Sequence, residues 1–259
     1  MIVHSVLSHH PAAVADEMMR FLTSLGKGVP FCLGYGGLRE EFDRIKFPEK
    51  FFLDAPTLRG RIEEQNFSCW LNATASWCQA QGHTPDLVHF TENDHLPLRS
   101  DYWAELGSVA AKSGKDFLGK WCMDRTNTNE QLYLHYRDDA RLHRHLALIS
   151  VHSDRRTLWG ALADGMLLRW SALAALSNVD LDFPCFTEIL IPSTLYHLGF
   201  TLGDFDAWSP IYRSLRHRPA YEMSDVRAMM PRKPFCCHPF KDVEGLPGIY
   251  DLVLPPGLA

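Results

Sequence analysis

The sequence predicts an α/β fold in which a mainly parallel sheet is flanked by helices. Short runs of aliphatic and β-branched residues recur through the first hundred residues, and a polar loop follows each run. Between several runs, apolar residues recur at the spacing of a helix face. Strands that alternate with helices are typical of parallel, helix-covered sheets. The 259 residues suffice for one such domain and no linker or internal repeat divides them, so we expect a single domain over 1–259.

The amino-terminal segment is expected to form the first strand and helix. Residues 2–7 are short and aliphatic, and the polar residues 8–10 end the strand in a loop. Apolar residues at helical spacing then predict a helix over 14–25, and Gly26 supplies its stop.

Three further strands are expected in the first half, over 31–35, 51–53 and 86–90, with a helical stretch from roughly 61 to 79. A polar cluster, 91–95, follows the last of these strands directly. Because ligands of open α/β sheets bind at the carboxyl ends of strands, this cluster is expected at the ligand crevice.

The second half has a less regular pattern. Apolar spacing predicts one helix around 103–110, another over 167–176, and a third around 195–198 before Gly199.

Composition excludes several classes of function. The formal net charge is −5 and the basic residues form no run, so nucleic acid is not an expected partner. No segment has the pattern of a signal peptide or about 18 consecutive apolar residues, so no transmembrane segment is expected. The seven cysteines are unpatterned and lack a C-x-x-C pair, which favours a cytoplasmic protein; peripheral contact with a membrane stays open.

Glu92 and Asp94 are the first candidates for chemistry. Alternate residues of an extended chain project to the same side, so the two carboxylates can face the same bound cation. Magnesium and manganese prefer oxygen ligands and leave open positions for phosphate oxygens. The alternative is a polar loop that caps the next helix.

Four segments together resemble glycosyltransferases of the GT-A fold. DLVHFTENDHLPLRSDYWAEL (86–106) is similar to the strand that leads into the D-x-D motif, and WGALADGMLLRWSALAAL (159–176) resembles the acceptor-side segment. FPCFTEILIPSTLYHLGF (183–200) resembles the segment with the catalytic acid, and HPFKD (238–242) the tail that returns a histidine to the metal. The resemblance implies a Rossmann-like fold with a nucleotide-sugar-binding half, about 1–100, and an acceptor and catalytic half, about 101–259.

The resemblance also implies a metal site for Mn²⁺ or Mg²⁺. Asp94 would be the metal-ligating acid and His238 a further ligand, with Glu92 on the metal or the donor. Glu92 replaces the usual first Asp of the motif, which puts its direct coordination in doubt. A histidine on the surface beside Pro239 is the alternative for His238.

The donor is expected to be a UDP- or GDP-linked sugar. Asp54 resembles the acid that contacts the base or ribose, although a turn ahead of Pro56 explains it equally. The complete set of candidate donor contacts is Ser8, His9, Asp54, Arg59, Glu92 and Lys241.

Glu188 is the candidate catalytic base of an inverting transfer, in which a carboxylate takes the proton of the acceptor hydroxyl. Pro192 predicts that a helix begins close to it, with Glu188 around the amino end. That position favours the ionised carboxylate and argues against a strongly raised pKa. An acid selected only by the helix dipole is the alternative.

Asp164 is the candidate for hydrogen bonds to the acceptor or the donor sugar, because it lies in the glycine-containing loop 160–165. An Asp-Gly turn is the alternative. Trp159 and Trp170 could stack on a sugar or belong to the core.

The expected function is therefore metal-dependent transfer of a sugar from a nucleotide-diphosphate donor to a hydroxyl of a glycan or glycolipid, as in polysaccharide biosynthesis. A sugar-nucleotide-binding protein without catalysis stays open. So does a metal-dependent hydrolase that uses His9, His10, Glu92 and Asp94, although no H-E-x-x-H spacing occurs.

Overall fold

The computed structural model describes residues 1–55, 58 and 64–254. In this part of the chain, seven strands form one mixed sheet in the order β10-β6-β9-β4-β1-β2-β3. The strands are β1 (Ile2–Ser8), β2 (Phe31–Tyr35), β3 (Lys50–Phe52), β4 (Leu87–Glu92), β6 (Phe117–Gly119), β9 (Met166–Arg169) and β10 (Leu202–Asp204). Neighbouring strands are parallel except at β9, which is antiparallel to both β4 and β6. The expected α/β fold with a mainly parallel sheet is confirmed.

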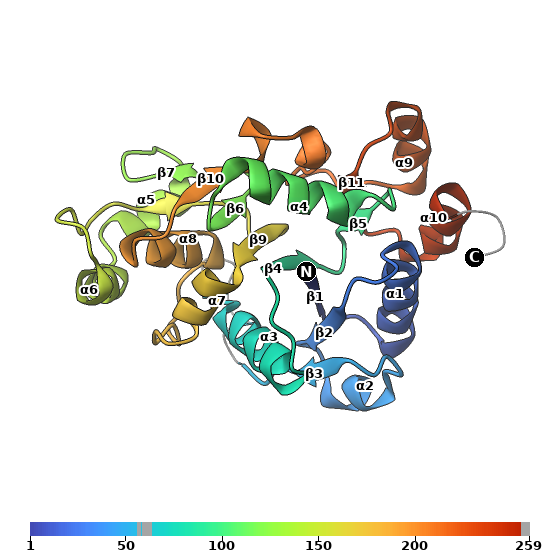
Figure 1. Cartoon of the computed structure of the whole chain (residues 1–259), viewed down its shortest axis with the longest axis horizontal. Helices are drawn as coiled ribbons and strands as arrows, with labels where there is room; N and C mark the ends of the chain where they lie inside the picture. Colours follow the sequence, from blue (N-terminus) through green and yellow to red (C-terminus); the bar gives the residue numbers. More distant parts are fainter. Residues whose placement is uncertain (56–57, 59–63, 255–259) are drawn as a thin grey trace.

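Helices cover both faces of this sheet (Figure 1). On one face, α1 (Ala12–Leu25) and α4 (Tyr102–Ser113) cover the sheet, and α10 (Leu246–Val253) packs against α1. On the other face lie α3 (Ser68–Ala80), α7 (Trp170–Leu176) and α8 (Thr187–His197). There α6 (Ala140–Ile149) packs against α8, and α5 (Gln131–Arg137) contributes to the same apolar cluster. The remaining helices are α2 (Arg39–Arg44), α9 (Met223–Met229), and the short η3 (Phe205–Ala207), η4 (Pro210–Tyr212), η5 (Met230–Arg232) and η6 (Val243–Gly245).

Two short antiparallel pairs attach loops to this framework. β5 (Leu96–Pro97) pairs with β11 (Cys236–Cys237), and β7 (Met123–Asp124) pairs with β8 (Trp159–Gly160). The first pair brings the carboxyl-terminal part of the chain back to the loop that follows β4.

Side chains of β1 alternate between the two helix layers that cover the sheet. Val3 and Leu7 face the α3 side, whereas Val6 faces the α1 side, and all three are buried. The polar residues of the strand find partners: Trp103 Nε1 donates to His4 Nδ1 at 2.9 Å, and Trp70 Nε1 donates to Ser5 Oγ at 2.8 Å. Both helix layers are therefore tied to this strand by hydrogen bonds as well as by apolar contact.

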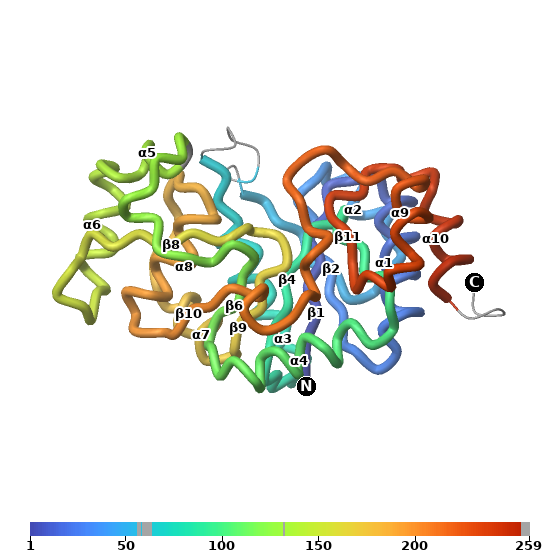
Figure 2. The backbone as a smooth tube through the Cα atoms, turned by 90° about the horizontal axis from the view of Figure 1, so that it is seen from above, coloured from blue at the N-terminus to red at the C-terminus, as the bar shows by residue number. Residues whose placement is uncertain are grey.

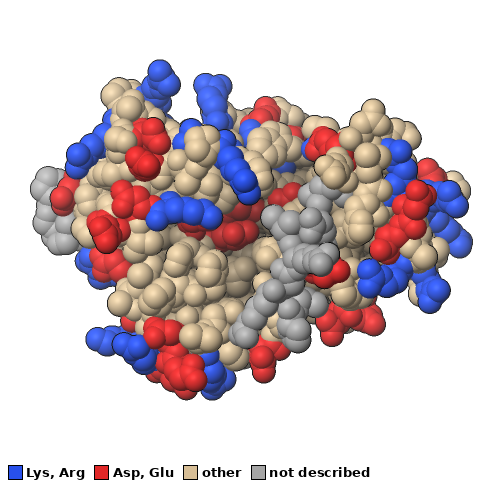
Figure 3. Space-filling model, turned by 180° about the vertical axis from the view of Figure 1, so that it is seen from behind, with Lys and Arg blue, Asp and Glu red and all other residues tan. Residues whose placement is uncertain are grey.

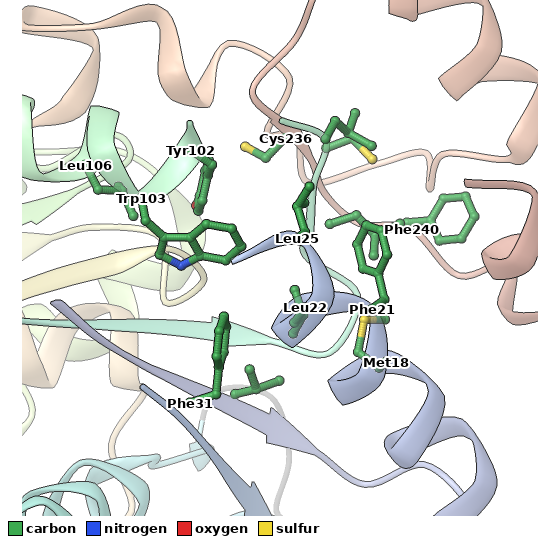
Figure 4. Close-up of a cluster of buried hydrophobic side chains, with 14 of the residues drawn as sticks. Met18, Phe21, Leu22, Leu25, Phe31, Tyr102, Trp103, Leu106, Cys236 and Phe240 are labelled. Carbon is green, nitrogen blue, oxygen red and sulfur yellow. The ribbon is translucent and has the colours of Figure 1, made fainter. Parts of the chain in front are cut away.

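The core on the α1 side joins segments that are far apart in sequence. In Figure 4, Leu22 and Leu25 of α1 lie near Trp103 of α4, and Cys236 and Phe240 from the carboxyl-terminal part lie close by. Burial of this cluster holds the segment around β11 against the amino-terminal half.

The first-half predictions agree with the structure to within a few residues. The strands expected at 2–7, 31–35, 51–53 and 86–90 and the helix expected over 14–25 are present, and Gly26 ends α1. The helix expected from roughly 61 begins only at Ser68; part of that stretch, with Arg59, lies outside the described residues.

One prediction in the second half was wrong. Residues 167–176 were expected to form a single helix, but 166–169 form β9 and the helix α7 begins at Trp170. Leu167 and Leu168 lie between β4 and β6 and are buried on both faces of the sheet, and a short apolar run of this kind does not distinguish a buried strand from a helix.

The strand order reverses beside β1, which has β2 on one side and β4 on the other. This is a topological switch point, and the crevice outside the carboxyl ends of β1 and β4 is where open α/β sheets bind ligands. In Figure 2 the start of the chain lies at the lower edge, so the carboxyl ends of β1 and β4 face the upper side. Among the described residues, no helix is long and apolar enough to cross a membrane.

Candidate functional site

The carboxyl edge of the sheet collects four acidic residues from three separate segments. Glu92 is the last residue of β4, and Asp94 lies in the turn that follows it. Asp164 precedes β9, whose antiparallel direction brings its amino end to the same edge. Glu188 lies in the first turn of α8. Figure 3 looks onto this edge, and Asp and Glu side chains lie in the central hollow of that face.

Asp94 and His238 are in direct contact. His238 Nε2 lies 3.2 Å from Asp94 Oδ1, and the backbone N–H of Phe240 donates to the carbonyl of Asp94 at 2.8 Å. Lys241 Nζ lies 3.7 Å from Asp94 Oδ2, with its side chain 69% exposed. The tail 238–241 is thus attached to the loop after β4, while the roles of His238 on a metal and of Lys241 on a phosphate stay predictions.

This pair of side chains fits two adjacent ligands of a hard divalent cation. Neighbouring ligand atoms of an octahedral ion bound at about 2.1 Å are about 3 Å apart, close to the Asp94–His238 separation. Asp94 Oδ1 and His238 Nδ1 are buried and make no hydrogen bond within the described part of the chain. That part contains no preformed group of three or more such ligands, so a cation bound here needs oxygens from water or a bound phosphate to complete its shell.

Asp164 is a buried anchor of the site. Its Oδ1 accepts from the backbone N–H of Glu92 at 2.8 Å, and its Oδ2 lies 2.6 Å from His95 Nδ1 and 3.8 Å from His238 Nδ1. Burial alone raises the pKa of Asp164, but His238 and His95 outweigh it and hold that pKa below its ordinary value. The carboxylate is therefore an anion engaged with protein groups, and its predicted contact with a sugar stays a prediction.

His238 carries a proton in the metal-free site at neutral pH. Burial disfavours the imidazolium, but the carboxylates of Asp164 and Asp94 outweigh burial and raise the pKa of His238 to about 9. A cation that binds through this imidazole must displace the proton.

Glu92 has the opposite electrostatic environment. Burial and the nearby Asp94 and Asp164 raise the pKa of Glu92 well above its ordinary range. A carboxyl group kept protonated in this way donates a hydrogen bond, so in the metal-free site Glu92 suits a contact with a hydroxyl or phosphate oxygen.

Glu188 is held at the amino end of α8, as predicted, but Pro192 lies inside the helix and not at its start. Pro192 has no N–H, so the carbonyl of Glu188 four residues earlier accepts instead from the N–H of Ala161 at 3.0 Å. Glu188 Oε1 also accepts from the N–H of Ala163 at 3.1 Å. Glu188 thus connects the loop before Asp164 to α8 through both its backbone carbonyl and its side chain.

The predicted ionisation of Glu188 was wrong. The sequence argument expected no strongly raised pKa, yet burial raises the pKa of Glu188 to about 7, although the Ala163 N–H and Arg125 oppose this shift. Removal from water outweighs the helix terminus at this partly buried carboxyl. A pKa near neutrality suits a general base.

A pocket of about 330 Å³ opens beside these acids, within the size range of sites for small ligands. Glu92 and the ends of β1 and β2 contribute to its wall. It is lined by Leu7, Ser8, His9, Gly36, Leu58, Gln65, Phe67, Glu92 and Asn93. Ser8 and His9 are thus part of the pocket wall, with Ser8 buried and His9 exposed, and their contact with a donor stays a prediction.

Other predicted residues are not brought to this pocket. Asp54 is exposed beyond the end of β3 and does not line it, and Arg59 lies outside the described residues. Trp159 and Trp170 are partly buried and pack against the core on the α8 side. The observed positions agree with the alternative in which these two tryptophans belong to the core.

Sequence reasoning missed His95 as a functional residue. Its Nδ1 contacts Asp164 and its Nε2 lies 2.8 Å from Tyr102 Oη, so it connects the acids to a buried network that includes Tyr212 and His89. The one signal available was its position next to Asp94, because the partner Asp164 is 69 residues away. Asn93, Gln65 and Phe67 were missed for the same reason: only the fold brings them to the pocket.

No protein-family model matches this chain, and no curated protein matches its sequence.

Proposed function

We propose that this protein is a metal-dependent glycosyltransferase of the GT-A type, which moves a sugar from a UDP- or GDP-linked donor to a hydroxyl of a glycan or glycolipid. The observation that carries the proposal is the contact between Asp94 and His238 at the switch point of the sheet, next to Glu92, which lines the pocket. Glu188 lies close enough for the charge of His238 to lower its pKa. The seven cysteines have free thiols, which supports a reducing cytoplasm as its location.

In this proposal the donor occupies the pocket lined by Ser8, His9 and Glu92. Asp94 and His238 would hold Mn²⁺ or Mg²⁺, which supplies positive charge opposite the leaving diphosphate. Lys241 is exposed near Asp94 and can reach a phosphate oxygen. The protonated form of Glu92 would donate a hydrogen bond to the donor.

Glu188 would act as the base. Its ionised form accepts the proton of the acceptor hydroxyl as that oxygen attacks the anomeric carbon, which gives inversion of configuration. The hydrogen bond from Ala163 fixes one carboxylate oxygen and leaves the other for the acceptor. Orientation of the carboxylate and a pKa near neutrality both support this role.

A test of donor binding is thermal unfolding with UDP- and GDP-linked sugars, each with and without Mn²⁺. A donor at a hundred times its Kd stabilises by about 2.7 kcal/mol, which raises the Tm by several degrees. Asp94→Ala is expected to remove the metal-dependent part. If no nucleotide sugar shifts the Tm under either condition, the proposal fails.

A second candidate, nucleotide-sugar binding without catalysis, is favoured by one observation: Glu188 already anchors the loop before Asp164 through its side chain. Glu188→Gln separates the two. If the protein is a transferase, this variant is still stabilised by the donor but its turnover falls about 10²-fold or more. If the protein only binds the donor, neither form has turnover.

A further inference from the structure

A second concave surface continues from the candidate site along the same edge of the sheet. Lys120 follows β6 and Asp206 follows β10, and both line an open hollow of about 660 Å³; a second hollow of about 680 Å³ adjoins it. Pro210 and Arg213 line both hollows, so the two are continuous. We call this surface the basic groove; it is lined by Lys120, Trp208, Arg213, Arg216, Arg232 and Lys233.

The basic groove is connected directly to the candidate base. The carbonyl of Lys120 accepts from the N–H of Leu162 at 2.9 Å, and the next residue, Ala163, donates to Glu188. Lys120 of the groove and Glu188 therefore bind neighbouring residues of the same loop.

The charge of the groove contrasts with that of the whole chain. Its cations outnumber its acids although the protein has a formal net charge of −5. Lys120 is paired with Asp206, and Arg216 lies 3.6 Å from Asp225. Arg213, Arg232 and Lys233 are exposed and have no carboxylate at ion-pair distance among the residues that the structure describes. In Figure 3, Lys and Arg side chains gather above the acidic hollow.

Aromatic rings organise this surface. The guanidinium of Arg216 stacks 3.5 Å from the Tyr221 ring centroid, and that of Arg99 lies 3.9 Å from the centroid of Phe235. Each of these guanidiniums is also near a carboxylate, Arg216 near Asp225 and Arg99 near Asp101, so the two arginines form the wall of the groove. Trp208 is 42% exposed and offers a flat apolar face within the same groove.

We propose that the basic groove binds an anionic saccharide chain, and that this chain is the acceptor. Trp208 packs against a sugar ring, and Arg213, Arg232 and Lys233 bind the carboxylates or phosphates along the chain. The binding stands on the groove itself, whereas the role as acceptor rests on the proposed transferase activity. An extended chain fits better than a membrane surface, because the cations line a recess and not a convex face.

The test measures binding by the fluorescence of the tryptophans and by titration calorimetry, in the full chain without donor or metal. The probes are hexagalacturonate, a phosphorylated mannopentaose and neutral maltohexaose, together with phosphatidylglycerol vesicles. At least one anionic saccharide is expected to bind about tenfold or more tighter than maltohexaose, with an affinity that falls as salt is added.

Matched variants identify the surface that binds. Arg213→Gln with Arg232→Gln is expected to weaken the anionic saccharide about tenfold or more. Arg144→Gln with Arg155→Gln removes the same charge from exposed positions around α6 and is expected to leave binding unchanged. Trp208→Ala is expected to weaken binding of every saccharide that binds.

Three outcomes would overturn the proposal: equal affinity for the neutral and anionic saccharides, equal losses in the two arginine pairs, or binding to vesicles alone. These results are separate from the donor test. If the protein binds no nucleotide sugar but binds hexagalacturonate through Arg213, the transferase proposal fails. The groove is then a binding site for anionic saccharides, and the bound chain is not an acceptor.

Discussion

At the scale of single residues, the pKa of Glu188 leads to a pH dependence of activity. The base must be ionised, and burial raises its pKa to about 7. Turnover is therefore expected to rise with pH through about 7 and to level off above it. Glu188→Gln should lower turnover about 10²-fold or more on this plateau and should remove the rise. Initial rates with saturating donor between pH 5.5 and 8.5 check this. A variant that keeps the wild-type profile would remove Glu188 from the role of base.

The proton on His238 makes metal binding depend on pH. Its pKa of about 9 in the metal-free site means that Mn²⁺ must displace a proton below that value. Affinity is expected to weaken about tenfold for each pH unit from 8 to 6, a slope of one proton per ion. Calorimetry in buffers of different ionisation enthalpy counts the protons released. His238→Gln should abolish the slope; a wild-type affinity independent of pH would show that His238 is no ligand.

At the scale of elements, the turn into β9 depends on Gly165. Its φ is +80°, and a Cβ there would lie 2.9 Å from the ring of Tyr212. Gly165→Ala is therefore expected to lower the free energy of unfolding by about 2 kcal/mol or more and to displace the neighbouring Asp164. Gly28 is a matched control, with φ +83° and no atom within 4 Å of its Cβ position, so Gly28→Ala adds backbone strain without a clash. Urea unfolding of both variants tests this, and equal losses would contradict it.

The limits of sequence-based prediction follow from the same elements. The strands of the first half and the carboxylate loop after β4 could be predicted because local patterns mark them: an apolar run, then polar residues. β9 could not be predicted as a strand, because Leu167 and Leu168 are apolar residues that face opposite sides of the sheet, and α7 begins two residues later. The raised pKa of Glu188 was equally out of reach, because it depends on burial that only the packed loop before Asp164 provides.

At the scale of the whole molecule, the buried titratable groups together determine how the free energy of unfolding depends on pH. Glu188 and Glu92 have folded-state pKa values above the 4.5 of an unfolded glutamate, so the stability they contribute is lost as pH rises from that value to about 7 for Glu188 and to about 8 for Glu92. His238, with a pKa of about 9 against 6.5 unfolded, loses its contribution between these two values. His4 acts in the opposite direction, because burial lowers its pKa to about 3, and the unfolded chain gains a proton below 6.5.

Between pH 7 and 9 the signs agree, so the stability of the metal-free protein is expected to fall with pH over this range. Glu92 loses its proton up to about 8 and His238 up to about 9, and both changes favour the unfolded chain. Circular dichroism melts from pH 5 to 9 in the presence of a chelator measure the curve. Glu92→Gln stays neutral at every pH, so this variant should lose less stability than the wild type between pH 5 and 8 and the same amount above 8. A wild-type Tm that still rises between pH 7 and 9 would mean that these side chains are not held as described, and that the acidic edge of the sheet is more open to water than their burial implies.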